Sequence, residues 1–252
     1  MEPLTVWEAK QSPQREHWHA AMQAERESHK KNHTWEYADL PRPGRRAITC
    51  KWAFKLKVKP RDPTDVHNQD VICYKACLVA RGFTQVLGQD YTETWALVVK
   101  LTSLRVILSI AAAWDLELHG MDVETAFLHS DVTEDICMEQ PPLFPGGQPG
   151  QVFRLLKSMY GLKQAPRNWY QLLSDWLVQY GFRQSTADPC VFIYRGPDNS
   201  ICVIGLYVDD LAIAFNDHVF GATLKQDLDE RFRIVNMGEL SWIIGMTVAR
   251  DR

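Results

Sequence analysis

The sequence has no long hydrophobic run. Its longest apolar stretch, residues 106–114, is far shorter than the roughly 20 residues that a membrane-spanning helix needs. The first four residues, Met-Glu-Pro-Leu, do not resemble the start of a secretory signal peptide. We therefore expect an intracellular protein, cytoplasmic or nuclear, that is not secreted and has no membrane partner.

Closely spaced sets of cysteines are missing as well. The 252 residues include six cysteines, and the pair closest in sequence, Cys73 and Cys77, has no histidine or cysteine partner at zinc-finger spacing. This pattern predicts reduced thiols. Internal repeats and low-complexity tracts are also missing, so the composition is that of an ordinary globular chain.

An overall excess of positive charge is absent, since 28 Lys and Arg face 31 Asp and Glu, for a net charge of -3. This balance argues weakly against a nucleic-acid-binding protein, because such proteins are usually basic where they meet phosphate. The local distribution differs from the sum, because residues 41–61 contain eight basic residues and no acidic one. They are Arg42, Arg45, Arg46, Lys51, Lys55, Lys57, Lys59 and Arg61.

Within this basic segment, residues 51–59 alternate between charged and apolar side chains. The alternation predicts a strand with Trp52 and Phe54 on its packed face and four lysines on the other face, namely Lys51, Lys55, Lys57 and Lys59. Such a lysine face fits contact with phosphate. It is equally typical of an edge strand that avoids aggregation, so the residues alone leave both interpretations open.

The most informative stretch is residues 201–215, two apolar runs rich in β-formers that are interrupted by Asp209 and Asp210. This pattern predicts a buried β-hairpin with two carboxylates at its tip. Two adjacent negative charges at the edge of a core are unfavourable unless a cation neutralises them, and a divalent metal ion would do so. An Asp-Asp pair is also typical of a tight turn with no further role.

A third carboxylate favours the metal interpretation. Residues 116–122 alternate so that Leu118, Gly120 and Asp122 share one face, which predicts a second strand ending in an aspartate. Three carboxylates on neighbouring strand ends can hold two hard cations about 3.5–4 Å apart, the arrangement of polymerases and nucleases. The sequence predicts such a site if the two strands are adjacent.

Two helices have recognisable beginnings. Ser12 followed by Pro13 predicts the N-cap of a helix that extends to Lys31. Thr102 predicts the N-cap of a second helix, which extends to about Ala113 and carries an apolar stripe.

Turns and loops are marked by proline, glycine and aspartate. Residues 141–150 predict a loop, and Gly181 predicts the end of a helix that contains Trp169. Asp188, which precedes a proline, is read as a turn residue. Residues 242–248 predict a final strand.

Three segments together resemble one family. Residues 121–128 (Met-Asp-Val-Glu-Thr-Ala-Phe-Leu), 160–167 (Tyr-Gly-Leu-Lys-Gln-Ala-Pro-Arg) and 207–210 (Tyr-Val-Asp-Asp) look like the reverse transcriptase of copia-type LTR retrotransposons, in that family's order and approximate spacing. The similarity extends from about Trp18 to the C-terminus. It implies an α+β fold, the fingers and palm of a right-hand polymerase, with an antiparallel palm sheet packed on helices and with thumb and RNase H absent. The chain would then be a fragment of a Pol polyprotein or part of a decayed element.

The resemblance also implies a division of the chain. Residues 1–40 form a helical lead-in, 41–97 the fingers, 98–130 the palm with the first carboxylate, 131–164 a returning fingers segment, and 165–252 the palm with the Asp-Asp hairpin and a C-terminal strand.

Roles for single residues follow from the same resemblance. Catalysis is implied for Asp122, Asp209 and Asp210, which with the backbone of Val123 hold two Mg²⁺ ions, Mn²⁺ being an alternative. The nucleotide-binding residues that it implies are Lys75, Arg81, Phe127, Tyr160 and Gly161. A partly exposed ring at Phe127 would exclude a 2′-hydroxyl, whereas the residue type alone favours a core position. The implied nucleic-acid-binding residues are Lys51, Lys55, Lys57, Lys59, Gln164, Pro166 and Tyr207.

The sequence departs from the family pattern at a few positions. Cys77 stands where the family usually has arginine, Ala96 and Leu97 where it has serine and proline, and Val235 near where it has a lysine.

Two functions of different class follow. The first is an RNA-directed DNA polymerase core that adds dNTP units to a primer 3′-hydroxyl on an RNA or DNA template, with the rest of a Pol polyprotein as a further partner and a virus-like particle as one location. The second is a catalytically silent relic that folds and binds nucleic acid, which the departures favour. A metal-dependent nuclease would share the carboxylates but would not need an aromatic ring at Phe127.

Overall fold

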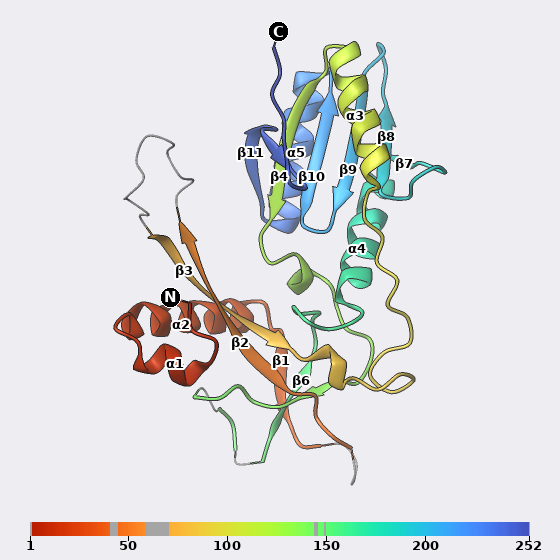
Figure 1. Cartoon of the computed structure of the whole chain (residues 1–252). Helices are drawn as coiled ribbons and strands as arrows, with labels where there is room; N and C mark the ends of the chain where they lie inside the picture. The colour runs from red at the N-terminus through yellow and green to blue at the C-terminus, as the bar shows by residue number, and fades with distance from the viewer. Residues whose placement is uncertain (1, 41–44, 59–70, 144–145, 149, 252) are drawn as a thin grey trace. The chain divides into compact units, whose positions relative to one another are not determined.

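The computed structural model describes residues 2–40, 45–58, 71–143, 146–148 and 150–251. The chain forms two compact units, each made of separate stretches of sequence (Figure 1). Residues 1–93 and 131–165 form the first unit, and residues 94–130 and 166–252 form the second. Both combine helices with antiparallel sheets, as the predicted α+β class requires.

The first unit contains two small sheets, one with strands β2 and β3 and the other in the order β1-β6-β5. Its helices and strands are α1 (Val6–Gln11), α2 (Arg15–Lys31), β1 (Trp35–Ala38), β2 (Cys50–Val58), β3 (Val71–Ala80), the 3-10 turn η1 (Gly82–Thr84), β5 (Cys137–Met138) and β6 (Val152–Leu155). Helix α2 covers the apolar face of the β2–β3 ribbon, because the buried Trp18 packs edge-on against Phe54 and Tyr74 with ring centroids 5.4 and 4.7 Å away.

The second unit is built on a six-stranded antiparallel sheet in the order β11-β4-β10-β9-β8-β7. Its elements are α3 (Leu101–Ala113), β4 (Glu117–Val123), η2 (Ala126–His129), α4 (Ala165–Tyr180), β7 (Arg183–Gln184), β8 (Val191–Arg195), β9 (Ile201–Tyr207), β10 (Asp210–Phe215), α5 (His218–Phe232), β11 (Ile234–Glu239), β12 (Trp242–Ile243) and β13 (Met246–Thr247).

Helices cover both faces of this sheet, α3 in front and α5 behind in Figure 1. Small residues let them approach closely. A Cβ atom on Gly205 would lie 3.0 Å from Ile107 of α3, and on the other face a Cβ on Gly221 of α5 would lie 2.4 Å from the ring of Phe215. The central strands β9 and β10 are therefore buried on both sides and form the core that carries the Asp-Asp turn.

Both predicted N-caps were wrong. Ser12 ends the short helix α1, which the sequence pattern did not reveal, and α2 begins after Gln14 without a side-chain cap. Helix α3 follows Lys100 rather than Thr102. The buried carboxylate of Asp188 accepts a hydrogen bond from the Lys100 N–H (2.8 Å), so a residue distant in sequence does the capping. Asp188 also accepts from the N–H of Cys190 (3.0 Å), which is consistent with its predicted place in a turn.

The predicted final strand at residues 242–248 was also wrong in part. The segment forms a hairpin of two short strands, β12 and β13, because Ile244 and Gly245 both adopt positive φ (48° and 74°) and reverse the chain. The described residues of 141–150 contain neither helix nor strand, as predicted, and α4 ends before Gly181 (φ 112°). No helix in the described ranges is long and apolar enough to span a membrane.

Candidate active site

The tip of the β9–β10 hairpin is a two-residue turn made by Val208 and Asp209, because Tyr207 pairs with Asp210 across it. Val208 has φ 55°, a left-handed conformation that a β-branched side chain rarely adopts. The indole N–H of Trp169, a buried residue of α4, donates a hydrogen bond to the Val208 carbonyl oxygen at 2.6 Å. Helix α4 therefore holds this turn in place.

Strand β4 brings the third carboxylate to the same turn. Asp122 lies directly opposite Asp210 in the antiparallel β4–β10 pair, and the N–H of Val123 donates to the carbonyl oxygen of Asp209 at 2.9 Å. The side chains of Asp122, Asp209 and Asp210 are all half-buried. The structure thus gathers the three predicted carboxylates at one end of adjacent strands.

The surroundings of Asp210 in this cluster disfavour its negative charge. Burial, followed by the charges of Asp209 and Asp122, raises the pKa of Asp210 to about 6. A carboxyl group with such a pKa is more easily neutralised than an exposed one, by a proton or by a cation.

The donor set fits a hard divalent cation, which prefers carboxylate oxygens. Across the described part of the chain, no group of three or more His, Cys, Asp or Glu side chains is arranged so that it could hold a metal ion as it stands. Three half-buried carboxylates, of which Asp209 and Asp122 raise the pKa of Asp210, are nevertheless a group of charges that a cation would stabilise. The residues present therefore suit Mg²⁺ in kind, and their side chains have to turn toward a shared ion.

A cavity of about 230 Å³ lies beside Asp122 and Asp210. Its other walls come largely from the segment that follows α5, including Met237, Leu240 and Trp242. Gly120 lets the side chain of Leu240 pack closely against β4, since a Cβ atom there would lie 2.9 Å from it. Sequence reasoning missed this wall because strands of two residues leave no periodic signal.

Phe127 lies in η2, a few residues beyond Asp122, and its side chain is only 7% exposed. The expectation of a partly exposed ring is therefore wrong. The N–H groups of Val123 and Glu124 are also engaged, with the carbonyl oxygens of Asp209 and Arg233.

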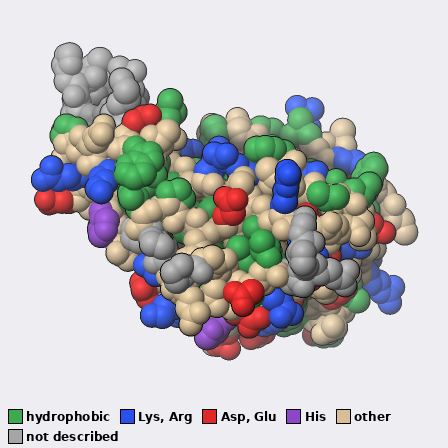
Figure 2. All heavy atoms as spheres, turned by 90° about the horizontal axis from the view of Figure 1, so that it is seen from below, with side chains coloured by type: hydrophobic (Ala, Val, Ile, Leu, Met, Phe, Trp, Pro, Cys, Tyr) green, Lys and Arg blue, Asp and Glu red, His purple; other side chains and the backbone are tan. Residues whose placement is uncertain are grey.

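In the first unit, the predicted lysine face is present on the β2–β3 ribbon. The register places Lys55 directly opposite Lys75, and Lys51 and Lys57 project from the same face. All four side chains are exposed. Lys59 lies outside the described residues. Figure 2 shows one face of the molecule, on which basic and acidic side chains are interspersed. That face as a whole does not carry charge of a single sign.

The first residues of the segment 160–167 pack against the end of β3. Ala80 donates its N–H to the Tyr160 carbonyl oxygen (2.8 Å), and Gly161 has φ 92°. Arg81 follows directly, with an exposed side chain. Gln164 has a side chain only 1% exposed and hydrogen-bonded within the protein, so the structure contradicts its predicted direct contact with nucleic acid. Pro166 and Tyr207, in the second unit, are half-buried.

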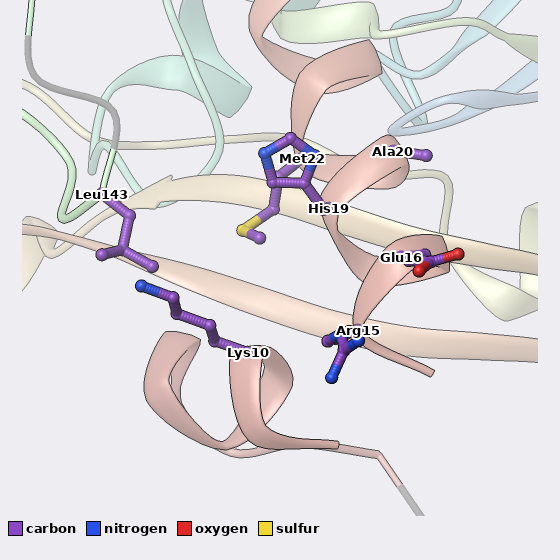
Figure 3. Close-up of a pocket in the computed structure, with 7 residues that line it drawn as sticks. All are labelled: Lys10, Arg15, Glu16, His19, Ala20, Met22 and Leu143. Atoms are coloured by element: carbon purple, nitrogen blue, oxygen red, sulfur yellow. The ribbon is translucent and has the colours of Figure 1, made fainter. Parts of the chain in front are cut away.

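A separate cavity of about 440 Å³ occurs in the first unit, lined by α1, α2 and the loop that carries Leu143 (Figure 3). Its polar lining residues are Lys10, Arg15, Glu16 and His19, all of them exposed. None of the predicted site residues lines it.

The chain belongs to the family described as reverse transcriptase (RNA-dependent DNA polymerase), which it matches over residues 32–252. This finding confirms the resemblance to the reverse transcriptases of copia-type retrotransposons. Its curated relatives include the Retrovirus-related Pol polyprotein from transposon TNT 1-94 of Nicotiana tabacum, 42% identical over 252 residues. The corresponding Pol polyproteins from transposons RE1 and RE2 of Arabidopsis thaliana are each 36% identical to it. These alignments cover 100%, 99% and 99% of the chain, but the chain spans only 18%, 16% and 16% of the respective relatives.

Proposed function

We propose that this chain is the polymerase core of a retrotransposon and transfers nucleotides from dNTP to a primer 3′-hydroxyl on an RNA or DNA template. The observation that carries the proposal is the register of β4 and β10, which sets Asp122 opposite Asp210 at the Asp209 turn. Membership of the reverse transcriptase family supports it. The catalytically silent relic remains the alternative, and the departures at Cys77 and Val235 favour it.

We further propose a polymerase division of the two units. The second unit corresponds to the palm, residues 98–130 and 165–252 in the predicted division. The first corresponds to the helical lead-in, residues 1–40, and to the fingers, residues 41–97 and 131–164. The family membership and the mixed antiparallel architecture support this assignment.

Asp122, Asp209, Asp210 and the backbone of Val123 would hold two Mg²⁺ ions, or Mn²⁺. Bound there, the metal would lower the pKa of the primer hydroxyl and neutralise charge on the transferring phosphate. The carboxylates orient that chemistry through the rigid β4–β10 pair and through the turn that Trp169 holds. Pyrophosphate is the product that leaves.

The residues of the first unit supply binding. Lys75 and Arg81, both exposed, are suited to the triphosphate, and Arg81 offers the planar fork that matches phosphate oxygens. Tyr160 and Gly161 support the nucleotide. The template and primer lie against the lysine face that Lys51, Lys55 and Lys57 form, with Pro166 and Tyr207 as contacts in the second unit. The rest of a Pol polyprotein would act beside this core, in the cytoplasm within a virus-like particle or in the nucleus.

Phe127 provides the experiment that tests this function. Only an enzyme that builds DNA needs to reject ribose, so a ring beneath the sugar should set the preference for deoxynucleotides. In primer extension, wild-type protein should prefer dNTP to NTP, and Phe127→Val should incorporate NTP more readily while dNTP use changes less.

Because the Phe127 ring is buried, shortening it should also lower stability, by less than the ~3–5 kcal/mol of a full Phe truncation to Ala. Phe192→Val, at another buried phenylalanine of the second unit, controls for that loss. An active Phe127→Val protein with the wild-type sugar preference would contradict the assignment of Phe127, and one that behaves like Phe192→Val would leave the ring a core residue.

A further inference from the structure

The turn at residues 160–164 and the end of β3 are packed backbone against backbone. A Cβ atom on Gly82 would lie 2.1 Å from the Gly161 carbonyl oxygen, and one on Gly161 would lie 1.9 Å from the Ala80 carbonyl oxygen. No side chain fits between the two segments at these points. Their relative position is therefore fixed at the level of the main chain, next to three residues that we assign to nucleotide binding, Arg81, Tyr160 and Gly161.

A buried glutamine joins the same two segments through its side chain. Gln85, 5% exposed, accepts a hydrogen bond from the Lys163 N–H through its Oε1 atom at 2.9 Å. Its Nε2 atom donates to Oε1 of Gln164 at 3.0 Å and approaches the Asp90 carbonyl oxygen at 3.5 Å. The side-chain amide of Gln85 thus binds the turn at 160–164 through both its oxygen and its nitrogen atom.

The partners of Gln85 make further hydrogen bonds of their own. Gln164 donates through Nε2 to the Asp90 carbonyl oxygen at 2.8 Å. The Asp90 carboxylate, also buried, accepts from the N–H of Val86 at 2.8 Å and from the guanidinium of Arg45 at 3.4 Å. We call this set the Gln85–Gln164–Asp90 network. A buried polar network whose members are satisfied specifies one arrangement of the segments that it joins, because any other arrangement leaves buried groups without partners.

The network ends at a positive charge. Lys163, whose N–H is held by Gln85, directs its ammonium group to the Tyr91 hydroxyl at 2.9 Å and lies 4.3 Å from the centre of the Tyr91 ring. The segment 85–91 therefore fixes Lys163 at both its main chain and its side chain.

We propose that Gln85 is a positioning residue for nucleotide binding: it locks the turn at 160–164 onto the end of β3, so that Arg81, Tyr160, Gly161 and Lys163 present one rigid surface to the incoming nucleotide. The inference rests on the proposed function. The sequence pattern did not mark Gln85, because its partners lie 78 and 79 positions away.

The first test measures the lock without any activity. Hydrogen exchange of the full chain should show the Lys163 amide exchanging at least about tenfold faster in Gln85→Met than in wild type, while the amides of β2 and β3 keep their protection. Met has nearly the shape of Gln but no hydrogen-bonding amide. Gln89→Met, at an exposed position of the same unit, is the matched control and should leave the Lys163 amide unchanged. Equal exchange in wild type and Gln85→Met would overturn the proposal.

The second test separates positioning from simple destabilisation. The double variant Gln85→Met/Gln164→Met removes both partners of the amide pair, so its loss of Tm should be smaller than the sum of the two single losses. If Gln85 positions the nucleotide site, the KM for dNTP in primer extension should stay at least about threefold above wild type in the double variant, with a smaller change in kcat. A wild-type KM in the double variant despite its lowered Tm would mean a structural role only.

Two further results separate failure of this inference from failure of the proposed function. Incorporation of dNTP by wild type with an unchanged KM in Gln85→Met would remove the role of Gln85 and leave the polymerase assignment standing. No incorporation by wild type would contradict the polymerase assignment and the nucleotide role of Gln85 with it. Gln85→Glu keeps the acceptor for the Lys163 N–H. The Lys163 amide should therefore exchange more slowly in Gln85→Glu than in Gln85→Met, and faster exchange in Gln85→Glu would also overturn the proposal.

Discussion

At the scale of single residues, Asp210 has the most informative environment. Its folded pKa of about 6 is above the ordinary value of 3.8, because burial and the charges of Asp209 and Asp122 disfavour its ionised form. The folded protein therefore binds this proton more tightly than the unfolded chain does. The stability that this group contributes is present below about pH 4 and is lost as the pH rises through about 6.

Asp210→Asn does not titrate, so without metal its Tm should exceed that of wild type at about pH 7.5, and the difference should shrink as the pH falls toward about 4. Mg²⁺ should raise the Tm of wild type more than that of the variant. Asp229→Asn, an exposed carboxylate of the same unit, should show neither trend. Thermal unfolding across this pH range would contradict the account if the difference between Asp210→Asn and wild type did not depend on pH.

Gly161 is a second residue whose identity is dictated by its surroundings. It combines a positive φ of 92° with a main-chain contact that leaves no space for a Cβ atom. Gly161→Ala should lower the free energy of unfolding by ~2–4 kcal/mol, from strained backbone and overpacking together. Gly88→Ala, where φ is 79° and nothing lies within 4 Å of the added Cβ, isolates the backbone contribution and should be milder in denaturant unfolding. Equal losses in the two variants would mean that the contact with Ala80 is unimportant.

At the scale of elements, the β2–β3 ribbon combines two functions of an alternating strand. Its apolar face packs on α2, and its other face sets Lys55 opposite Lys75. Like charges directly opposite each other are unfavourable for a sheet. Their presence indicates a surface that an anion would stabilise, which is compatible with the proposed contact with nucleic acid.

Replacing Lys51, Lys55 and Lys57 by Gln should weaken binding to duplex nucleic acid irrespective of sequence. It should also flatten the slope of log affinity against log salt by about 0.9 for each phosphate that the protein no longer neutralises. The control variant replaces Lys10, Lys30 and Lys31, exposed lysines outside the ribbon, and changes the net charge by the same amount. If both triple variants gave the same slope, the ribbon would have no special role in binding.

The elements also show what sequence patterns can and cannot predict. The β9–β10 hairpin and β4 were predictable because strict alternation and buried apolar runs extend over six or seven residues in each strand. The start of α2 was not, since no side chain caps it, and the cap of α3 was not, since Asp188 acts on Lys100 from a distant part of the chain. The β12–β13 hairpin was not predictable, because two-residue strands show no periodicity. The cavity wall at Leu240 and Trp242 was therefore not predictable either.

At the scale of the whole molecule, the family is established. The proposed site consists of three aspartates that the sequence pattern identifies, although the pattern does not show that they are adjacent. The resemblance supplied their roles, while the pairing of Asp122 with Asp210 came only from the structure, because strand order is a property of tertiary packing. Gln164 shows the limit of transferring roles by motif. Its place in the segment 160–167 suggested contact with nucleic acid, and its burial shows that it supports the fold instead.

The measurement that tests the central claim most directly is extension of a DNA primer on an RNA template by the full chain, with dNTP and either Mg²⁺ or Mn²⁺. The account predicts metal-dependent extension with release of pyrophosphate, loss of extension in Asp122→Asn and in Asp209→Asn, and near wild-type extension in Glu124→Gln, which changes an exposed carboxylate two positions from Asp122. Extension that survives both aspartate variants, or wild-type protein that extends no primer with either metal, would contradict it.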